Sequence, residues 1–144
     1  MSHKTTANLL KTLKDVNSRE KLSGYIKRLD KQGADMDFKD YYKSLPEVKA
    51  LKSARIIESS GINRTYYYQL MDGTRSPGRD KILLLCLAAR LPLNKVQRAL
   101  EISGQAILYA RNKRDSAIIF AVNKKLTVPE VNELLFQLEE PLLK

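Results

Sequence analysis

The chain has 144 residues, of which 43% are hydrophobic and 29% are charged, and its net charge is +10. This length and composition exclude a disordered chain and suffice for a core that needs neither disulfides nor a metal. The longest uncharged apolar run, Ile82 to Ala89, is too short to cross a bilayer and no signal-peptide pattern opens the chain, so we expect a cytoplasmic protein without membrane contact.

Apolar residues recur three and four positions apart throughout the chain, which is the period of a helix and not of a strand. Residues 1–35 are predicted to form a helical pair whose second helix ends at Gly33. The apolar positions are Leu9, Leu10, Leu13 and Val16 in the first helix and Leu22, Tyr25, Ile26 and Leu29 in the second. The sequence therefore predicts an all-α, multi-helix bundle that opens with an N-terminal helical pair.

Residues 38–103 are predicted to form the next domain. A helix starts at Phe38 and stops before Pro46, because proline lacks an amide and clashes with the preceding helical turn. Ser44 and Glu47 have the spacing of a capping box that would start a short helix to about Ala50. Further helices are predicted over residues 52–59, 63–71 and 77–90.

Two stretches that lie 35 positions apart are similar. Arg79-Asp80 aligns with Arg114-Asp115, and the same offset aligns five apolar pairs. These pairs are Leu84 with Ile119, Leu91 with Leu126, Leu93 with Val128, Val96 with Val131, and Leu100 with Leu135. The pattern fits a duplicated architecture or two similar helical hairpins stacked together. Residues 104–144 are accordingly predicted to be a C-terminal helical extension, a hairpin packed on domain 38–103.

The segment from Ser53 to Gly73 predicts two short helices separated by a turn at Gly61, where glycine can adopt the positive φ that a tight turn needs. The expected inward positions are Ile56, Ile57, Ile62, Tyr67 and Leu70. The expected outward positions are Arg64, Thr65, Tyr68 and Gln69. Because a helix fits the major groove, and Arg and Gln suit guanine and adenine edges, this face is predicted to read bases in double-stranded DNA.

Gly61, Gly73 and the loop Thr74-Arg75-Ser76-Pro77 resemble the Cro/repressor (XRE-like) helix-turn-helix family in type and spacing. The resemblance implies a lambda-repressor-like fold, base contacts from Arg64, Thr65 and Gln69, and homodimers on two-fold sites. It also implies DNA backbone contacts from the following residues: Ser53, Tyr66, Arg75 and Arg79. The stretch from Leu108 to Ala121, with Val131-Asn-Glu-Leu-Leu, is similar to small bacterial helix-turn-helix proteins that carry a C-terminal helical extension.

The sequence departs from the family at its packing positions. An arginine and a glutamate that members commonly pair are replaced by Pro46 and Met71, so no single charge is left buried. Ile57 is larger than the usual alanine, and Ser53 reaches less far than the usual glutamine. A second basic cluster, Arg111, Lys113 and Arg114, is a candidate for supplementary phosphate contacts, although a solvated start of a helix is the alternative.

The predicted function is that of a sequence-specific DNA-binding protein, a transcriptional regulator. The net charge of +10 favours a polyanionic partner. The alternative is a protein-interaction module or inhibitor, for example phage or mobile-element encoded, that reuses the helix-turn-helix scaffold. Non-specific nucleic-acid binding is disfavoured because the basic charge is spread over the whole chain. We expect no enzyme, cofactor or metal site, since the sequence has no phosphate loop, metal-ligand cluster or nucleophile with a histidine base. Cys86 is expected to be a buried, inert thiol.

Overall fold

The structure is a computed structural model that describes residues 10, 13–14, 18–24 and 36–144. Every regular element in these ranges is a helix and none is a strand, which confirms the predicted all-α fold class. The chain divides into two units, Met1–Met36 and Asp37–Lys144, which we describe separately. The predicted N-terminal pair lies largely outside the described residues, and positions 10, 13–14 and 19–24 of it are helical.

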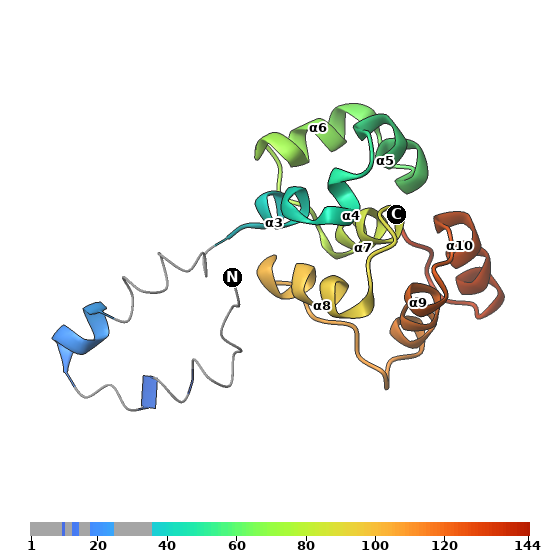
Figure 1. The fold of residues 1–144 in the computed structure, drawn as a ribbon. Coiled ribbons are helices and arrows are strands. Elements are labelled where there is room, and N and C mark those ends of the chain that lie inside the picture. Colours follow the sequence, from blue (N-terminus) through green and yellow to red (C-terminus); the bar gives the residue numbers. More distant parts are fainter. Residues whose placement is uncertain (1–9, 11–12, 15–17, 25–35) are drawn as a thin grey trace. The chain divides into compact units, whose positions relative to one another are not determined.

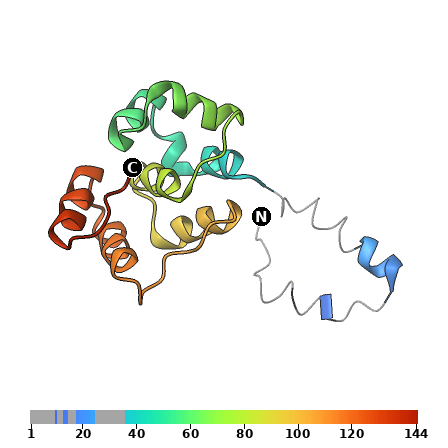
Figure 2. The same cartoon turned by 180° about the vertical axis from the view of Figure 1, so that it is seen from behind.

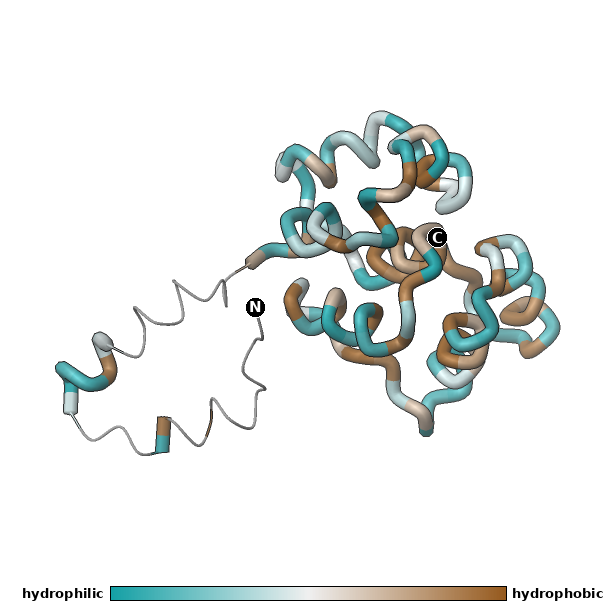
Figure 3. Tube along the Cα trace, viewed as in Figure 1, coloured by the Kyte–Doolittle hydropathy of each residue, from teal (hydrophilic) through white to brown (hydrophobic). Residues whose placement is uncertain are grey.

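The second unit is built around α7, which is covered on several sides (Figures 1 and 2). Its helices are α3 (Phe38–Ser44), α4 (Pro46–Lys49), α5 (Ser53–Ser60), α6 (Arg64–Asp72), α7 (Arg79–Ala88), α8 (Leu93–Ile102), α9 (Lys113–Lys124) and α10 (Val128–Gln137). Residues 82 to 87 of α7 are all buried, and α5, α8 and α10 pack against this helix. Figure 3 shows this centre as a concentration of hydrophobic residues. Burial raises the pKa of the Cys86 thiol in α7 to about 12.

The start of the unit differs from the predicted capping box. Ser44 is the last residue of α3, and its hydroxyl donates a 2.6 Å hydrogen bond to the Tyr41 carbonyl. The N-cap of α4 is Leu45, without a side-chain cap, and Pro46 occupies the first turn. Glu47 accepts hydrogen bonds from the Lys95 ammonium at 2.8 Å instead of capping the helix. The predicted interruption before Pro46 is confirmed, but the predicted capping residues are wrong.

Helices α7–α8 and α9–α10 are two copies of one motif, which we call repeat 1 (residues 79–108) and repeat 2 (residues 114–143). The turn inside each repeat has a residue in the left-handed conformation at the equivalent position, with φ of 54° at Arg90 and 56° at Lys125. Each repeat then closes with equivalent backbone hydrogen bonds, from Gln105 to Leu100 and from Glu140 to Leu135. The sequence offset of 35 is therefore a structural duplication.

The tails of the repeats are held in the same way. The Gln97 side chain accepts from the Leu108 amide at 2.7 Å and donates to its carbonyl at 2.9 Å. Asn132 makes the same pair of bonds with Leu143, at 2.8 and 3.2 Å. Leu108 and Leu143 are both buried, so each tail returns to the core. The predicted domain boundary at 103/104 falls inside repeat 1, and residues 37–144 form one compact unit.

The two repeats exchange ion pairs. Arg79 of repeat 1 donates to both carboxylate oxygens of Asp115 in repeat 2, at 3.1 and 2.9 Å. Arg114 of repeat 2 donates to both oxygens of Asp80 in repeat 1, at 3.1 and 3.0 Å. Each arginine also donates to two carbonyls in the tail of its own repeat. Arg79 donates to Ala106 and Ile107, and Arg114 donates to Pro141 and Leu142. Such paired, bidentate contacts fix the two repeats against each other.

Candidate nucleic-acid interface

The candidate interface lies on the outer face of α6. Its inner face is anchored by Tyr67 and Leu70, which are both buried in the core. Positions 64, 65 and 68 fall on the other side of the helix, and the side chains of Arg64, Thr65 and Tyr68 are exposed there. Gln69 is half-buried at the edge of this face. The four residues predicted to read bases are thus brought together on one helix.

Local sequence signals explain why α6 has this orientation. Gly61 ends α5 with a φ of 72°, the left-handed conformation that glycine adopts without steric cost. The hydroxyl of the buried Ser60 accepts from the Ile62 amide at 3.2 Å, and Ile62 is buried beneath the turn. Asn63 then caps α6 by accepting from the Tyr66 amide at 3.2 Å. The turn and cap together direct the first residues of α6 outward.

The opposite end of α6 is fixed by α3 and by the loop that follows. The Lys43 ammonium of α3 donates to the Met71 carbonyl at 3.1 Å, at the end of the helix where a cation is favourable. The Arg75 amide donates to the Gln69 carbonyl at 3.1 Å, so the loop after Gly73 folds back onto α6. Met71 and Ile57, two of the departures from the family pattern, are half-buried against the core.

Two groups of cations and aromatic rings lie on this side of the unit. The guanidinium carbon of Arg64 lies 5.9 Å from the centre of the Tyr68 ring. Two cations lie near the Tyr66 ring, with the Arg75 guanidinium carbon 5.7 Å and the Lys81 ammonium 5.5 Å from its centre. These distances are in the range of cation–π attraction. Lys81 was not predicted as a site residue; its place in the first turn of α7, just after the basic loop, is the signal that could have identified it.

The charge along this segment has one sign. No acidic residue occurs between Ser59 and Met71, and the first one, Asp72, is the last residue of α6. Contacts with the side chain and backbone amide of Thr74 lower the pKa of Asp72, whose carboxylate accepts from that amide at 2.8 Å. The only charged side chain between Ser59 and Met71 is therefore that of Arg64, which lies at the positive end of the α6 dipole.

Ser53, predicted to approach a phosphate, is the first residue of α5 and is exposed. The N-cap of α5 is Lys52, which makes no side-chain capping bond, so the first amides of this helix are not covered by a cap. Lys52 and Arg55 are exposed beside it. Exposed amides and cations of this kind suit a phosphate oxygen.

No family model, curated protein or solved structure matches this chain. The resemblance to the Cro/repressor family therefore depends only on the sequence motifs, which are Gly61, Gly73 and the loop from Thr74 to Pro77. Among the described residues, no helix combines the length and the apolar character needed to cross a bilayer.

The structure places the remaining predicted residues away from the interface or inside other contacts. All three guanidinium nitrogens of Arg79 donate to Asp115, Ala106 or Ile107, so this side chain joins the repeats and is not available for a phosphate. Arg114 is used in the same way. Lys113 donates to the Leu138 carbonyl at 2.8 Å. Within the described part of the chain, Arg111 is the one cation of the predicted second cluster that is exposed and forms neither a hydrogen bond nor an ion pair through its side chain. We therefore remove Arg79 and Arg114 from the candidate phosphate contacts and add Lys81.

Proposed function

We propose that the protein is a sequence-specific DNA-binding protein in which α5 and α6 act as a helix-turn-helix. The observation that carries the proposal is the outer face of α6, where Arg64, Thr65 and Tyr68 are exposed over an acid-free stretch. A helix of this diameter fits the major groove, and its opposite face is anchored by buried Tyr67 and Leu70. The helix would therefore enter the groove as a rigid element.

The proposed contacts fall into two groups. Arg64 and Gln69 would make paired hydrogen bonds with guanine and adenine edges, and Thr65 and Tyr68 would contact thymine methyl groups or phosphates. Ser53, Tyr66, Arg75 and Lys81 would fix the register on the DNA backbone. The Tyr66 ring, with Arg75 and Lys81 both within cation–π distance, would keep these cations close to α6.

A single helix reads few bases, so we propose that the protein acts as a homodimer on a two-fold site with half-sites about one helical turn apart. The proposed role is regulation of transcription, as the resemblance to the Cro/repressor family implies. Affinity would depend steeply on salt, because each neutralised phosphate releases a condensed counterion.

Selection of bound duplexes from a random DNA library tests the proposal. We expect enrichment of a two-fold motif, and a loss of about 1–3 kcal/mol of binding free energy for each paired base contact removed in Arg64→Ala/Gln69→Ala. Arg75→Ala should instead weaken binding to every duplex and reduce the salt slope by about 1. Asn123→Ala/Lys124→Ala removes one amide and one cation from exposed positions of α9, outside the proposed contacts, and serves as the matched control.

Failure to enrich any motif, or equal binding by Arg64→Ala/Gln69→Ala and the control, would contradict the proposal. The second candidate is a protein-interaction surface at the same place. It is favoured by Tyr68, which is 45% exposed with Arg64 against its ring, since Tyr and Arg are frequent hot-spot residues in protein interfaces. A stoichiometric protein partner whose binding is lost in Arg64→Ala/Tyr68→Ala, without selective DNA binding, would support that alternative.

A further inference from the structure

The loop between α8 and α9 is tightly held although it lies outside the helices. Gln97 makes both of its side-chain bonds with the backbone of Leu108, and the Tyr109 amide donates to Asp115 at 3.0 Å. On either side of the buried Leu108, the Ile107 side chain is 47% exposed and the Tyr109 side chain is 60% exposed. The loop therefore presents two large apolar side chains to solvent in a fixed position. We call residues 107–111 the knob.

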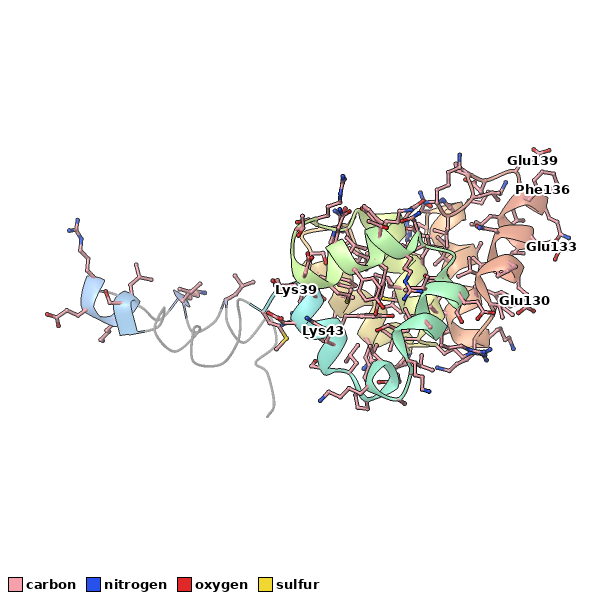
Figure 4. The ribbon with its side chains drawn as sticks, turned by 90° about the horizontal axis from the view of Figure 1, so that it is seen from above. Lys39, Lys43, Glu130, Glu133, Phe136 and Glu139 are labelled. Atoms are coloured by element: carbon pink, nitrogen blue, oxygen red, sulfur yellow. The ribbon has the colours of Figure 1, made fainter. Side chains whose placement is uncertain are left out.

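The end of α10 forms an open hollow with an aromatic wall. Phe136 is 74% exposed there, the largest exposed fraction of any large hydrophobic residue in the second unit. Figure 4 shows Phe136 between Glu133 and Glu139 on the outer side of this end. The hollow has a volume of about 690 Å³, and its lining includes Phe136, Pro141, Leu142, Glu139, Glu140 and Lys144. Two carboxylates against one ammonium leave this lining with a net negative charge.

The sequence separates charge between the knob and the hollow. Between Glu101 and Asp115 every charged residue is basic, and Arg111 in the knob is exposed. Between Lys125 and Lys144 every charged residue is acidic, although the whole chain has a net charge of +10. An exposed cation beside exposed apolar side chains thus complements an aromatic wall flanked by carboxylates.

The knob and the hollow both contact the first turn of α9. The Tyr109 amide of the knob is bonded to Asp115 in this turn, as described above. Lys113 in the same turn donates to the Leu138 carbonyl at 2.8 Å, and Arg114 donates to the Pro141 carbonyl at 2.9 Å. The knob and the hollow are therefore neighbours at one end of repeat 2, within one compact unit.

We propose that this end of repeat 2 binds the same end of a second copy, with the knob of each copy in the hollow of the other. Tyr109 of one copy packs against Phe136 of the other, and Arg111 faces Glu133. Tyrosine and arginine are frequent anchors of protein interfaces, and exposed apolar residues of this size mark interaction sites.

A second copy is favoured as the partner because the surface is complementary to itself. A two-fold axis through this end forms both knob-and-hollow contacts at once and leaves no unpaired half. The inference names a surface for the homodimer proposed above, but no step of it depends on DNA binding. Its test uses no DNA, so its failure is distinguishable from a failure of the proposed function.

Sedimentation equilibrium of the full chain and its variants tests the contact. We expect the wild-type chain to dimerise. Arg111→Glu and Glu133→Lys should each weaken the dimer by about tenfold or more, because each change occurs twice in a two-fold contact and places like charges together. Phe136→Ala should weaken the dimer at least as much, because it removes the aromatic wall of the hollow.

An equimolar mixture of Arg111→Glu and Glu133→Lys is the decisive measurement. In the mixed dimer, the introduced carboxylate of one variant faces the introduced ammonium of the other. The native Arg111 and the native Glu133 face each other at the second, equivalent contact. We therefore expect the mixture to associate with about the wild-type affinity, although each variant alone dimerises weakly.

The matched controls are Lys49→Glu and Glu58→Lys, which reverse the charge of exposed residues in α4 and α5, outside this end. Both controls should dimerise like the wild-type chain. Circular dichroism confirms that each variant keeps its helices. A monomeric wild-type chain, equal dimerisation of the controls and the charge-reversal variants, or failure of the mixture to associate would overturn the proposal.

Discussion

Repeat 1 and repeat 2 place equivalent residues in the same backbone geometry but in different surroundings. Both have a left-handed residue between their helices and an amide side chain that holds a returning leucine. Repeat 1 is enclosed by α3, α5 and repeat 2, whereas repeat 2 leaves Phe120 at the surface. Backbone geometry is set by local signals that each repeat carries, while burial is set by what the rest of the chain packs against it.

The exchanged ion pairs give the sharpest test of this comparison. The Asp115 side chain is 9% exposed and also accepts from the Tyr109 amide at 3.0 Å, whereas the Asp80 side chain is 30% exposed. Asp115→Asn should lower the free energy of unfolding by about 3–5 kcal/mol, because it leaves the Arg79 guanidinium without a counter-charge. Asp80→Asn should cost about 1 kcal/mol, since solvent screens that pair.

Urea denaturation of the two variants measures the difference, with the slope of the transition checked for a change in the unfolded state. If both variants lost the same stability, the two pairs would be equivalent in energy as well as in geometry. The asymmetry of burial between the repeats would then have no energetic consequence at this position.

Leu85 and Phe120 occupy equivalent positions of the two repeats and give a second test. Leu85 is fully buried, and its carbonyl accepts from the Tyr42 hydroxyl of α3 at 2.8 Å. Leu85→Ala should lower the free energy of unfolding by about 2–5 kcal/mol, because it leaves a cavity under α3. Phe120→Ala should cost less than about 1.5 kcal/mol in the isolated chain, since half of the ring already contacts water. Thermal and urea unfolding at a protein concentration below that of self-association measure both. A cost for Phe120→Ala as large as that for Leu85→Ala would mean that the face of repeat 2 is covered.

Sequence reasoning predicted the parts of the molecule that local signals determine. The bounds of α5 and α6 were predicted to within one residue, because Gly61 and Gly73 both have the positive φ that favours glycine. The inward helical residues of this segment, such as Ile56 and Tyr67, follow from helical period. The 35-residue repeat was also visible, because its apolar positions and its Arg-Asp pairs recur in order.

Contacts between distant residues could not be predicted in this way. Arg79 was assigned to DNA by its position in a family pattern, but its partner Asp115 lies 36 residues away and becomes a neighbour only when the repeats pack. Ser44 and Glu47 had the spacing of a capping box, yet Glu47 accepts a hydrogen bond from Lys95, 48 residues away, instead of capping the helix. Lys81 reaches Tyr66 only because the loop after Gly73 folds back. Each of these outcomes depends on tertiary packing, which spacing alone does not encode.

The smallest expected effect concerns the residues that end the second helix of each repeat. Gly104 of repeat 1 and Glu139 of repeat 2 are equivalent, with φ of 71° and 57°. Left-handed backbone costs a residue with a Cβ about 1 kcal/mol, while glycine loses more entropy on folding. Glu139→Gly should therefore stabilise the protein by about 0.5 kcal/mol, and Gly104→Ala should destabilise it by about 1 kcal/mol.

A Cβ at Gly104 would meet no heavy atom within 4 Å, so the cost of Gly104→Ala is conformational and not steric. Small changes of this size are resolved by the shift in urea midpoint between variants measured side by side. Opposite signs for the two substitutions would show that equivalent positions obey the same backbone rule although different residues occupy them. If Glu139→Gly were destabilising, the Glu139 side chain would have to contribute a contact that repeat 1 lacks, and the two repeats would differ in their local encoding as well as in their surroundings.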